Sequence, residues 1–157
     1  MFQEMRRQDR MLTTEETTEI LQNGSYGILS LNGQRSDDYA YGIPMNYVYK
    51  NNCIYVHCAM EGKKLSHIQT NNKVSFCVVG NSTVLPEKFS TLYSSVIAFG
   101  QGHLIDGEEK TAALLALIDK YSADFKEKGE LYVASDKDKT LVIKITIDHM
   151  TGKARKA

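Results

Sequence analysis

Two adjacent lysines follow a glycine where the sequence changes from a strand pattern to a helix pattern. Gly62, Lys63 and Lys64 come shortly after the end of a strand that contains His57 and Ala59. The first turn of a helix carries unpaired N–H groups and a partial positive charge, so two ammonium groups there form a compact site for an anion. The alternative is a solvated lysine pair that tolerates an unfavourable helix dipole of roughly a few tenths of a kcal/mol. The lysines alone leave both interpretations open.

A proline lies inside another candidate strand. The stretch from Tyr41 to Tyr49 runs Tyr-Gly-Ile-Pro-Met-Asn-Tyr-Val-Tyr, with Pro44 near its middle. Because proline cannot donate to a strand ladder, this strand must lie at an edge or break locally. A ligand ring could then approach the backbone, or the proline could mark a bulge at a barrel corner. Both alternatives stay open.

The cysteines do not have the spacing of a metal or redox site. Cys53, Cys58 and Cys77 form an odd set without a CxxC pair, and we expect them to act as small buried hydrophobic residues. On a strand, Cys53 and His57 share one face while Cys58 points to the other, so no zinc site is predicted. The sequence also contains no GxGxxG, P-loop or HExxH motif.

The composition is that of a globular protein without a strong electric field. Nineteen Lys and Arg balance nineteen Asp and Glu in a chain of 157 residues, so neither nucleic acid nor a membrane is an expected partner. There is no apolar run long enough to cross a bilayer, and the N-terminal residues lack the apolar stretch of a signal peptide. A cytoplasmic protein is therefore expected.

Three helices and six strands are expected along the chain. Thr13 and Glu16 have the spacing of a capping box for a first helix that ends near Asn23. A short helix is expected over residues 62–70, and a longer one after Asp106 with an apolar stripe of Leu114, Leu115, Ile118, Tyr121 and Phe125. The strands are expected at residues 26–31, 39–49, 53–59, 73–80, 93–105 and 141–147.

These elements indicate a mainly β fold with added helices. Several strands follow one another without intervening helices, which favours an antiparallel sheet over alternating β-α-β units. Closing the sheet into a barrel would remove its exposed edges. A turn at residues 50–52 predicts a hairpin, and Gly100 and Gly102 suggest a bulge in the long strand that contains them. We expect one domain over residues 1–157, in which residues 1–11 form an N-terminal arm.

The order of these motifs resembles one family. Tyr41-Gly-Ile-Pro-Met-Asn-Tyr-Val-Tyr49, Ile54-Tyr-Val-His-Cys-Ala-Met-Glu-Gly-Lys-Lys-Leu65, Tyr93-Ser-Ser-Val96 and Gly152-Lys153 follow a Met-Arg-Arg arm and a capped helix. This arrangement is similar to the nitroimidazole-resistance proteins within the pyridoxamine-phosphate-oxidase-like FMN-binding split barrels. The similarity runs from about Met5 to Lys153, and its most specific part is the strand-His-x-Ala-x-x-Gly-x-Lys-helix unit. It implies an antiparallel six-stranded split β-barrel with peripheral helices.

The resemblance also implies a cofactor and its site. FMN would bind at the interface of a homodimer, and the protein would act on a small-molecule redox substrate. The implied cofactor-binding residues are Met45, Asn46 and Tyr47 beside the isoalloxazine, His57 and Ala59 beside the flavin or ribityl chain, Gly62, Lys63 and Lys64 at the phosphate, and Ser94 or Ser95 from the later strand. No metal is implied.

The resemblance makes an FMN oxidoreductase, with nitroaromatic compounds such as nitroimidazoles as substrates, the leading functional hypothesis. His57 is the candidate catalytic proton donor because imidazole titrates near neutral pH; a hydrogen-bonded strand residue that only supports the flavin is the alternative. His103 and His149 are given structural roles. The chain has no Trp and lacks the C-terminal Arg-x-His of true pyridoxamine-phosphate oxidases, so vitamin oxidation is not expected. Alternatives are a flavin-binding or electron-carrier module without turnover, and a haem-binding or haem-degrading relative.

Overall fold

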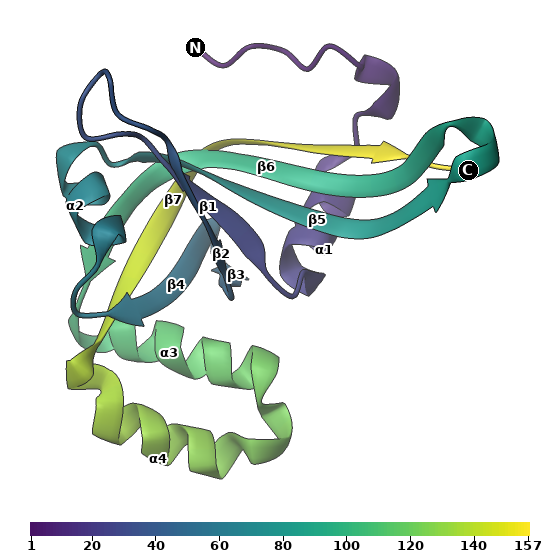
Figure 1. Ribbon diagram of the computed structural model, residues 1–157. Coiled ribbons are helices and arrows are strands. Elements are labelled where there is room, and N and C mark those ends of the chain that lie inside the picture. Colours follow the sequence, from purple (N-terminus) through teal and green to yellow (C-terminus); the bar gives the residue numbers. More distant parts are fainter.

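One antiparallel sheet of seven strands is the centre of the computed structural model, which describes all 157 residues (Figure 1). The strands are β1 (Gly27–Leu31), β2 (Tyr41–Met45), β3 (Val48–Lys50), β4 (Cys53–Ala59), β5 (Lys73–Leu85), β6 (Ser90–Ile105) and β7 (Thr140–Arg155). They lie in the order β2-β1-β5-β6-β7-β4-β3. The mainly β, antiparallel character predicted from the sequence is confirmed.

The sheet has one strand more than the six predicted, and it does not close through hydrogen bonds. The predicted strand 39–49 is divided at Asn46 and Tyr47 into β2 and β3, which lie at opposite ends of the hydrogen-bonded order. Pro44 lies in β2, which pairs on one side only, with β1. An edge strand tolerates proline because the missing N–H faces no neighbour. The edge placement predicted for Pro44 is confirmed.

The sheet curves around one main core. Its buried side chains come from strands at both ends of the sheet, so the two halves face each other across a shared interior. The largest of these side chains with almost no exposure are Tyr47, Phe76, Leu21, Leu29, Leu31, Ile54, Ile143 and Ile145. The ring of Phe76 lies 5.0 Å from that of Tyr47 in an edge-to-face arrangement, a geometry that aromatic pairs prefer.

The first helix begins where the sequence predicts. In α1 (Thr14–Asn23), the Thr13 side chain accepts a hydrogen bond from the Glu16 N–H at 3.2 Å, and the Glu16 carboxylate accepts one from the Thr13 N–H at 3.0 Å. This is the reciprocal capping box. The helix buries Leu21 in the core, so the cap holds the helix in register against the sheet.

Replacing Thr13 by alanine is expected to lower the free energy of unfolding by about 1 kcal/mol, because the N–H of Glu16 loses its acceptor. Urea unfolding followed by circular dichroism measures the change. The control is Thr14→Ala, which alters an exposed neighbour that makes no side-chain hydrogen bond. Equal losses in the two variants would contradict a capping role for Thr13.

Two further helices form a hairpin beside β4 and β7 (Figure 1). The predicted helix ends early, because α3 (Gly107–Tyr121) is followed by a separate α4 (Lys126–Asp136). Phe125 was expected on the inward stripe, but it lies in the turn between the helices and is 66% exposed. Gly129 lets α4 approach α3, since a Cβ there would collide with Ile118. Sequence patterning missed α4 because its apolar residues do not form a stripe.

The turns agree with the prediction. Asn51 and Asn52 join β3 to β4 with φ of 53° and 58°, values that asparagine tolerates better than most residues. The pairing of β6 with β7 shifts between Phe99 and Gly100, which confirms the predicted bulge. None of the helices has the length and apolar character needed to cross a membrane.

Candidate functional site

The start of α2 (Lys63–Thr70) has the properties of an anion site. Gly62 precedes the helix with φ of 146°, a conformation that glycine adopts without strain. No side chain caps the helix, and its first turn contains no acidic residue. The first N–H groups of α2 are therefore open to an external acceptor. Lys63 is exposed and Lys64 is half-buried, so their ammonium groups can reach a ligand there.

The side chains around this helix start come from two strands. The Lys63 ammonium lies 5.8 Å from the centre of the Tyr41 ring in β2. The Lys64 charge acts on the Cys58 thiol in β4, where it opposes the effect of burial on that pKa. The two lysines thus extend toward opposite ends of the strand order, with the helix start between them.

His67 anchors the same helix and is not among the site residues predicted from the sequence. Its ring is buried, its Nδ1 lies 2.6 Å from the Asn32 carbonyl oxygen, and it stacks on Tyr41 at 5.5 Å. His67 is four residues after Lys63 and so lies on the same helix face. This spacing is the signal that could have identified it as the residue that fixes α2 against the end of β1.

His57 and Ala59 lie together on the face of β4 that is turned toward the α3–α4 hairpin. Both are exposed, whereas Val56 and Cys58 point into the core. The His57 side chain borders a hollow of about 90 Å³ between the hairpin and the sheet. Its wall is formed by His57, Leu114, Leu117, Ile118, Tyr132, Val133, Asp136, Lys137 and Thr140. The imidazole is therefore accessible and borders a partly apolar space.

The three residues predicted beside the flavin ring differ in what they can offer. Met45 ends β2 and is half-buried. The Asn46 side chain donates to the Ser25 carbonyl at 3.0 Å. The Tyr47 side chain is fully buried, and its hydroxyl donates to the Leu21 carbonyl; burial and the neighbouring Tyr121 raise the pKa of Tyr47. Tyr47 as a whole has no exposure, so neither its ring nor its main chain is open to a ligand, whereas Asn46 is exposed.

Ser94 and Ser95 are remote from the other predicted site residues of the same chain. Ser95 lies ten residues before Ile105 in β6, and Ile105 is level with His57 through their shared partner Val142 in β7. At about 3.3 Å per residue, ten residues correspond to roughly 30 Å of strand. Within one chain, the structure brings together the residues around β4 and α2 but not these serines.

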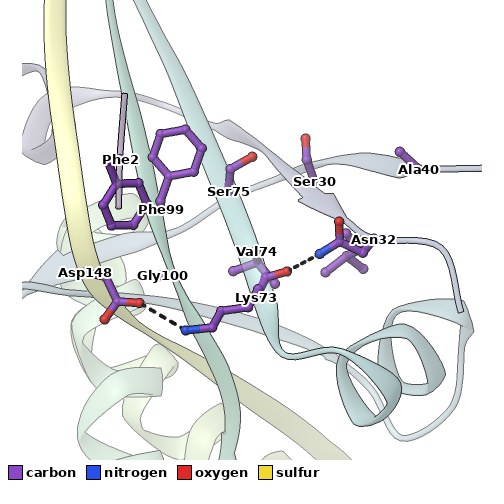
Figure 2. A pocket seen from close by; sticks show the side chains of 11 residues that line it. Phe2, Ser30, Asn32, Ala40, Lys73, Val74, Ser75, Phe99, Gly100 and Asp148 are labelled. Carbon is purple, nitrogen blue, oxygen red and sulfur yellow. Dashed lines mark hydrogen bonds and ion pairs between the residues drawn. The ribbon is translucent and has the colours of Figure 1, made fainter. Parts of the chain in front are cut away.

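A second hollow, of about 360 Å³, lies on the outer face of the sheet (Figure 2). Figure 2 shows Phe2 of the N-terminal arm beside Phe99, and the ion pair of Lys73 with Asp148, whose charged atoms are 3.8 Å apart. Phe2 also stacks on His149 at 4.6 Å. None of the predicted flavin residues borders this hollow, so it is separate from the site around α2.

The sequence of the chain matches a known protein family. The sequence model of the pyridoxamine 5'-phosphate oxidase family matches residues 13–154. The chain belongs to this family. The matched range includes all ten predicted cofactor residues, from Met45 to Ser95. No curated protein sequence matches the chain.

Solved structures show the same fold. A putative 5-nitroimidazole antibiotic resistance protein from Bacteroides thetaiotaomicron has 22% identity and a TM-score of 0.73, over 92% of this chain and 86% of its own. An FAD-binding protein from Mesorhizobium loti has 18% identity and a TM-score of 0.65, over 94% and 98%. The flavocytochrome Anf3 from Azotobacter vinelandii has 16% identity and a TM-score of 0.81, over 98% and 73%. At these identities, the likeness extends to the fold of this family member.

Proposed function

We propose that this protein is an FMN-dependent oxidoreductase that reduces nitroaromatic compounds such as nitroimidazoles. The observation that carries the proposal is the uncapped start of α2, where Gly62, Lys63 and Lys64 offer open N–H groups and two positive charges. This donor set suits a phosphate dianion, because charge-assisted hydrogen bonds contribute roughly 1.5–3 kcal/mol each. The names of the structural neighbours support a flavin and a nitroimidazole connection.

The chain's own residues would bind and orient the cofactor. Lys63 and Lys64 would hold the phosphate, while Met45 and the main chain of Asn46 would border the ring. A bound FMN supplies the electron or hydride transfer, and the protein supplies position and polarity. The exposed His57 imidazole on β4 would donate a proton, because an accessible histidine can act as a general acid.

The outer face of the sheet supports the proposal of a homodimer. Pro44, Ile28, Cys77 and Ile97 lie side by side on four neighbouring strands, as their pairing registers show. Ile97 is 41% exposed and Val79, two residues along β5 from Cys77, is 59% exposed. Apolar groups in a continuous row on a sheet are typical of a surface that another chain covers.

The same dimer would complete the flavin site. Strand side chains alternate between faces, so Ser95 shares the outer face with Ile97, whereas Ser94 points to the side occupied by α1. Ser95 is too far from the Lys63 of its own chain to bind the same ligand. A second copy bound to this face would bring its Ser95 to the first copy's cofactor. The first copy's Ser95 would likewise reach the second copy's cofactor.

The visible spectrum of the purified protein tests the proposal. Two visible flavin bands are expected, and chromatography of the released cofactor distinguishes FMN from FAD. After anaerobic chemical reduction, adding a nitroimidazole should restore the oxidised spectrum, whereas buffer should not. Reduction without reoxidation would support a carrier without nitro-reducing activity. A Soret band without flavin would support the haem-binding alternative.

The cysteines are expected to be dispensable for flavin uptake. Burial raises the pKa of the Cys58 and Cys77 thiols, so at neutral pH they carry less thiolate than a free cysteine and should react slowly. A variant with alanine at Cys53, Cys58 and Cys77 should bind FMN as wild type does. Its free energy of unfolding should fall by roughly 1–3 kcal/mol through lost packing. A variant that folds normally but cannot take up FMN would contradict this expectation.

A further inference from the structure

The C-terminal end of α3 is bonded to the main chain that connects β2 with β3. The Tyr121 hydroxyl accepts the Tyr47 N–H at 3.1 Å and has two possible acceptors, the Ser25 carbonyl at 2.7 Å and the Tyr47 carbonyl at 3.0 Å. The Lys120 ammonium donates to the Tyr47 carbonyl at 2.9 Å and lies 3.8 Å from the centre of the Tyr47 ring. Both polar groups of the Tyr47 main chain are therefore held by side chains of α3.

This arrangement is more specific than general packing. Tyr47 is separated from Lys120 by 73 residues and from Tyr121 by 74, so no local turn produces these contacts. Cation–π contacts favour an ammonium over an aromatic face, and Lys120 makes such a contact while it also donates to a carbonyl. Main-chain groups between two strands would otherwise bond to water. The C-terminal end of α3 thus holds the connection between β2 and β3, which the hydrogen bonds of these two strands do not hold.

The connection that these contacts hold is part of the proposed ring site. The proposed ring site includes the main chain of the exposed Asn46, whose side-chain amide is bonded to Ser25 and whose neighbour Tyr47 is fully buried. A site that depends on main-chain atoms needs those atoms held in place before the ligand arrives. The Asn46 and Tyr47 side chains bond to Ser25 and Leu21, and the α3 side chains hold the main chain of Tyr47.

We infer that Lys120 and Tyr121 are positioning residues, which hold the β2–β3 connection in the conformation that receives the flavin ring. This inference rests on the proposed flavin function. It extends that function to the α3–α4 hairpin, since the order of the ring site then depends on where α3 ends. Neither residue needs to touch the cofactor, and both act through the main chain of Tyr47.

The ionisation of Lys120 supplies an independent readout. Burial lowers the pKa of Lys120 to about 8, with no carboxylate contributing to the change. The titratable groups that face its ammonium are the phenols of Tyr47 and Tyr121. A neutral amine donates a weaker hydrogen bond than an ammonium and loses the cation–π contact. The hold on Tyr47 should therefore weaken as the pH rises from 7 to 9.

Four variants test the inference by titration with FMN and with riboflavin. Tyr121→Phe removes the hydroxyl and Lys120→Met removes the charge, while Tyr39→Phe and Lys128→Met make the same changes at exposed positions outside the proposed site. We expect the first two to weaken FMN and riboflavin equally, by about tenfold, because a smaller fraction of the protein is binding-competent. The controls should bind as wild type. Between pH 7 and 9, wild-type affinity should fall severalfold and that of Lys120→Met should stay flat.

Amide exchange in the flavin-free protein separates this inference from the proposed function. Tyr121→Phe leaves the Tyr47 N–H without its acceptor, so exchange at Tyr47 should accelerate about tenfold or more while core amides keep wild-type protection. Wild-type exchange at Tyr47 in both variants, or unchanged affinity for both flavins, would overturn the positioning role. A loss confined to FMN would also overturn it, since that indicates an effect on the phosphate. If wild-type protein binds no flavin, the proposed function fails, whereas accelerated exchange would still support the contacts.

Discussion

FMN affinity is expected to fall about ten- to a hundredfold when either Lys63 or Lys64 is replaced by alanine, while riboflavin affinity should barely change. FMN and riboflavin share the ring and ribityl chain and differ only in the phosphate. Each lysine offers a charge-assisted contact of roughly 1.5–3 kcal/mol, which corresponds to this range of affinity. The double variant should lose more, though less than the sum, because the open N–H groups of α2 remain.

The measurement is a titration of both ligands into wild type, the two single variants and the double variant, after circular dichroism has confirmed folding. Lys128→Ala, at an exposed position of α4, is the matched control for loss of a positive charge. Added salt should reduce the wild-type preference for FMN, since the contacts are exposed to screening. Equal losses of affinity for FMN and riboflavin, or no loss for either, would falsify the phosphate assignment. Lys63 and Lys64 would then be a solvated surface pair.

The parts of the fold that sequence patterning predicted are those set by local chemistry. The capping box at Thr13, the turn at Asn51 and Asn52, and the alternation that separates Cys53 from Cys58 depend on neighbouring residues. The division of residues 39–49 into two strands does not depend on neighbouring residues. It depends on the bonds that hold Tyr47 to α1 and α3, which lie far away in sequence.

The same distinction applies to the candidate site. The unit from His57 to Lys64 is continuous in sequence, and the structure places it at the end of one strand and the start of one helix. Ser95 lies in another part of the molecule, because β6 is long and antiparallel to its neighbours. Lys120 and Tyr121 were missed because their partners are main-chain groups, which the types of the residues do not reveal.

Replacing Ile97 by aspartate is expected to convert a dimer into a monomer and to abolish stable flavin uptake. Ile97 is the β6 member of the apolar row on the outer face, and it is 41% exposed in the single chain. The substitution therefore places a charge on the surface of a folded monomer but inside the proposed interface. An uncompensated charge buried there costs about 3–5 kcal/mol, which corresponds to more than a hundredfold weaker association.

Light scattering over a concentration series, with the flavin spectrum recorded on the same fractions, measures both effects. Leu104→Asp is the control, because it makes a similar change in the same strand at a residue that is 44% exposed. If Ser95 of a second copy completes the cofactor site, association and flavin content should fall together in Ile97→Asp and persist in Leu104→Asp. A wild-type monomer with full FMN occupancy would contradict the shared site, as would an Ile97→Asp variant that remains a dimer. A monomeric variant that keeps its flavin would separate the two properties and leave the cofactor to the residues around β4 and α2 alone.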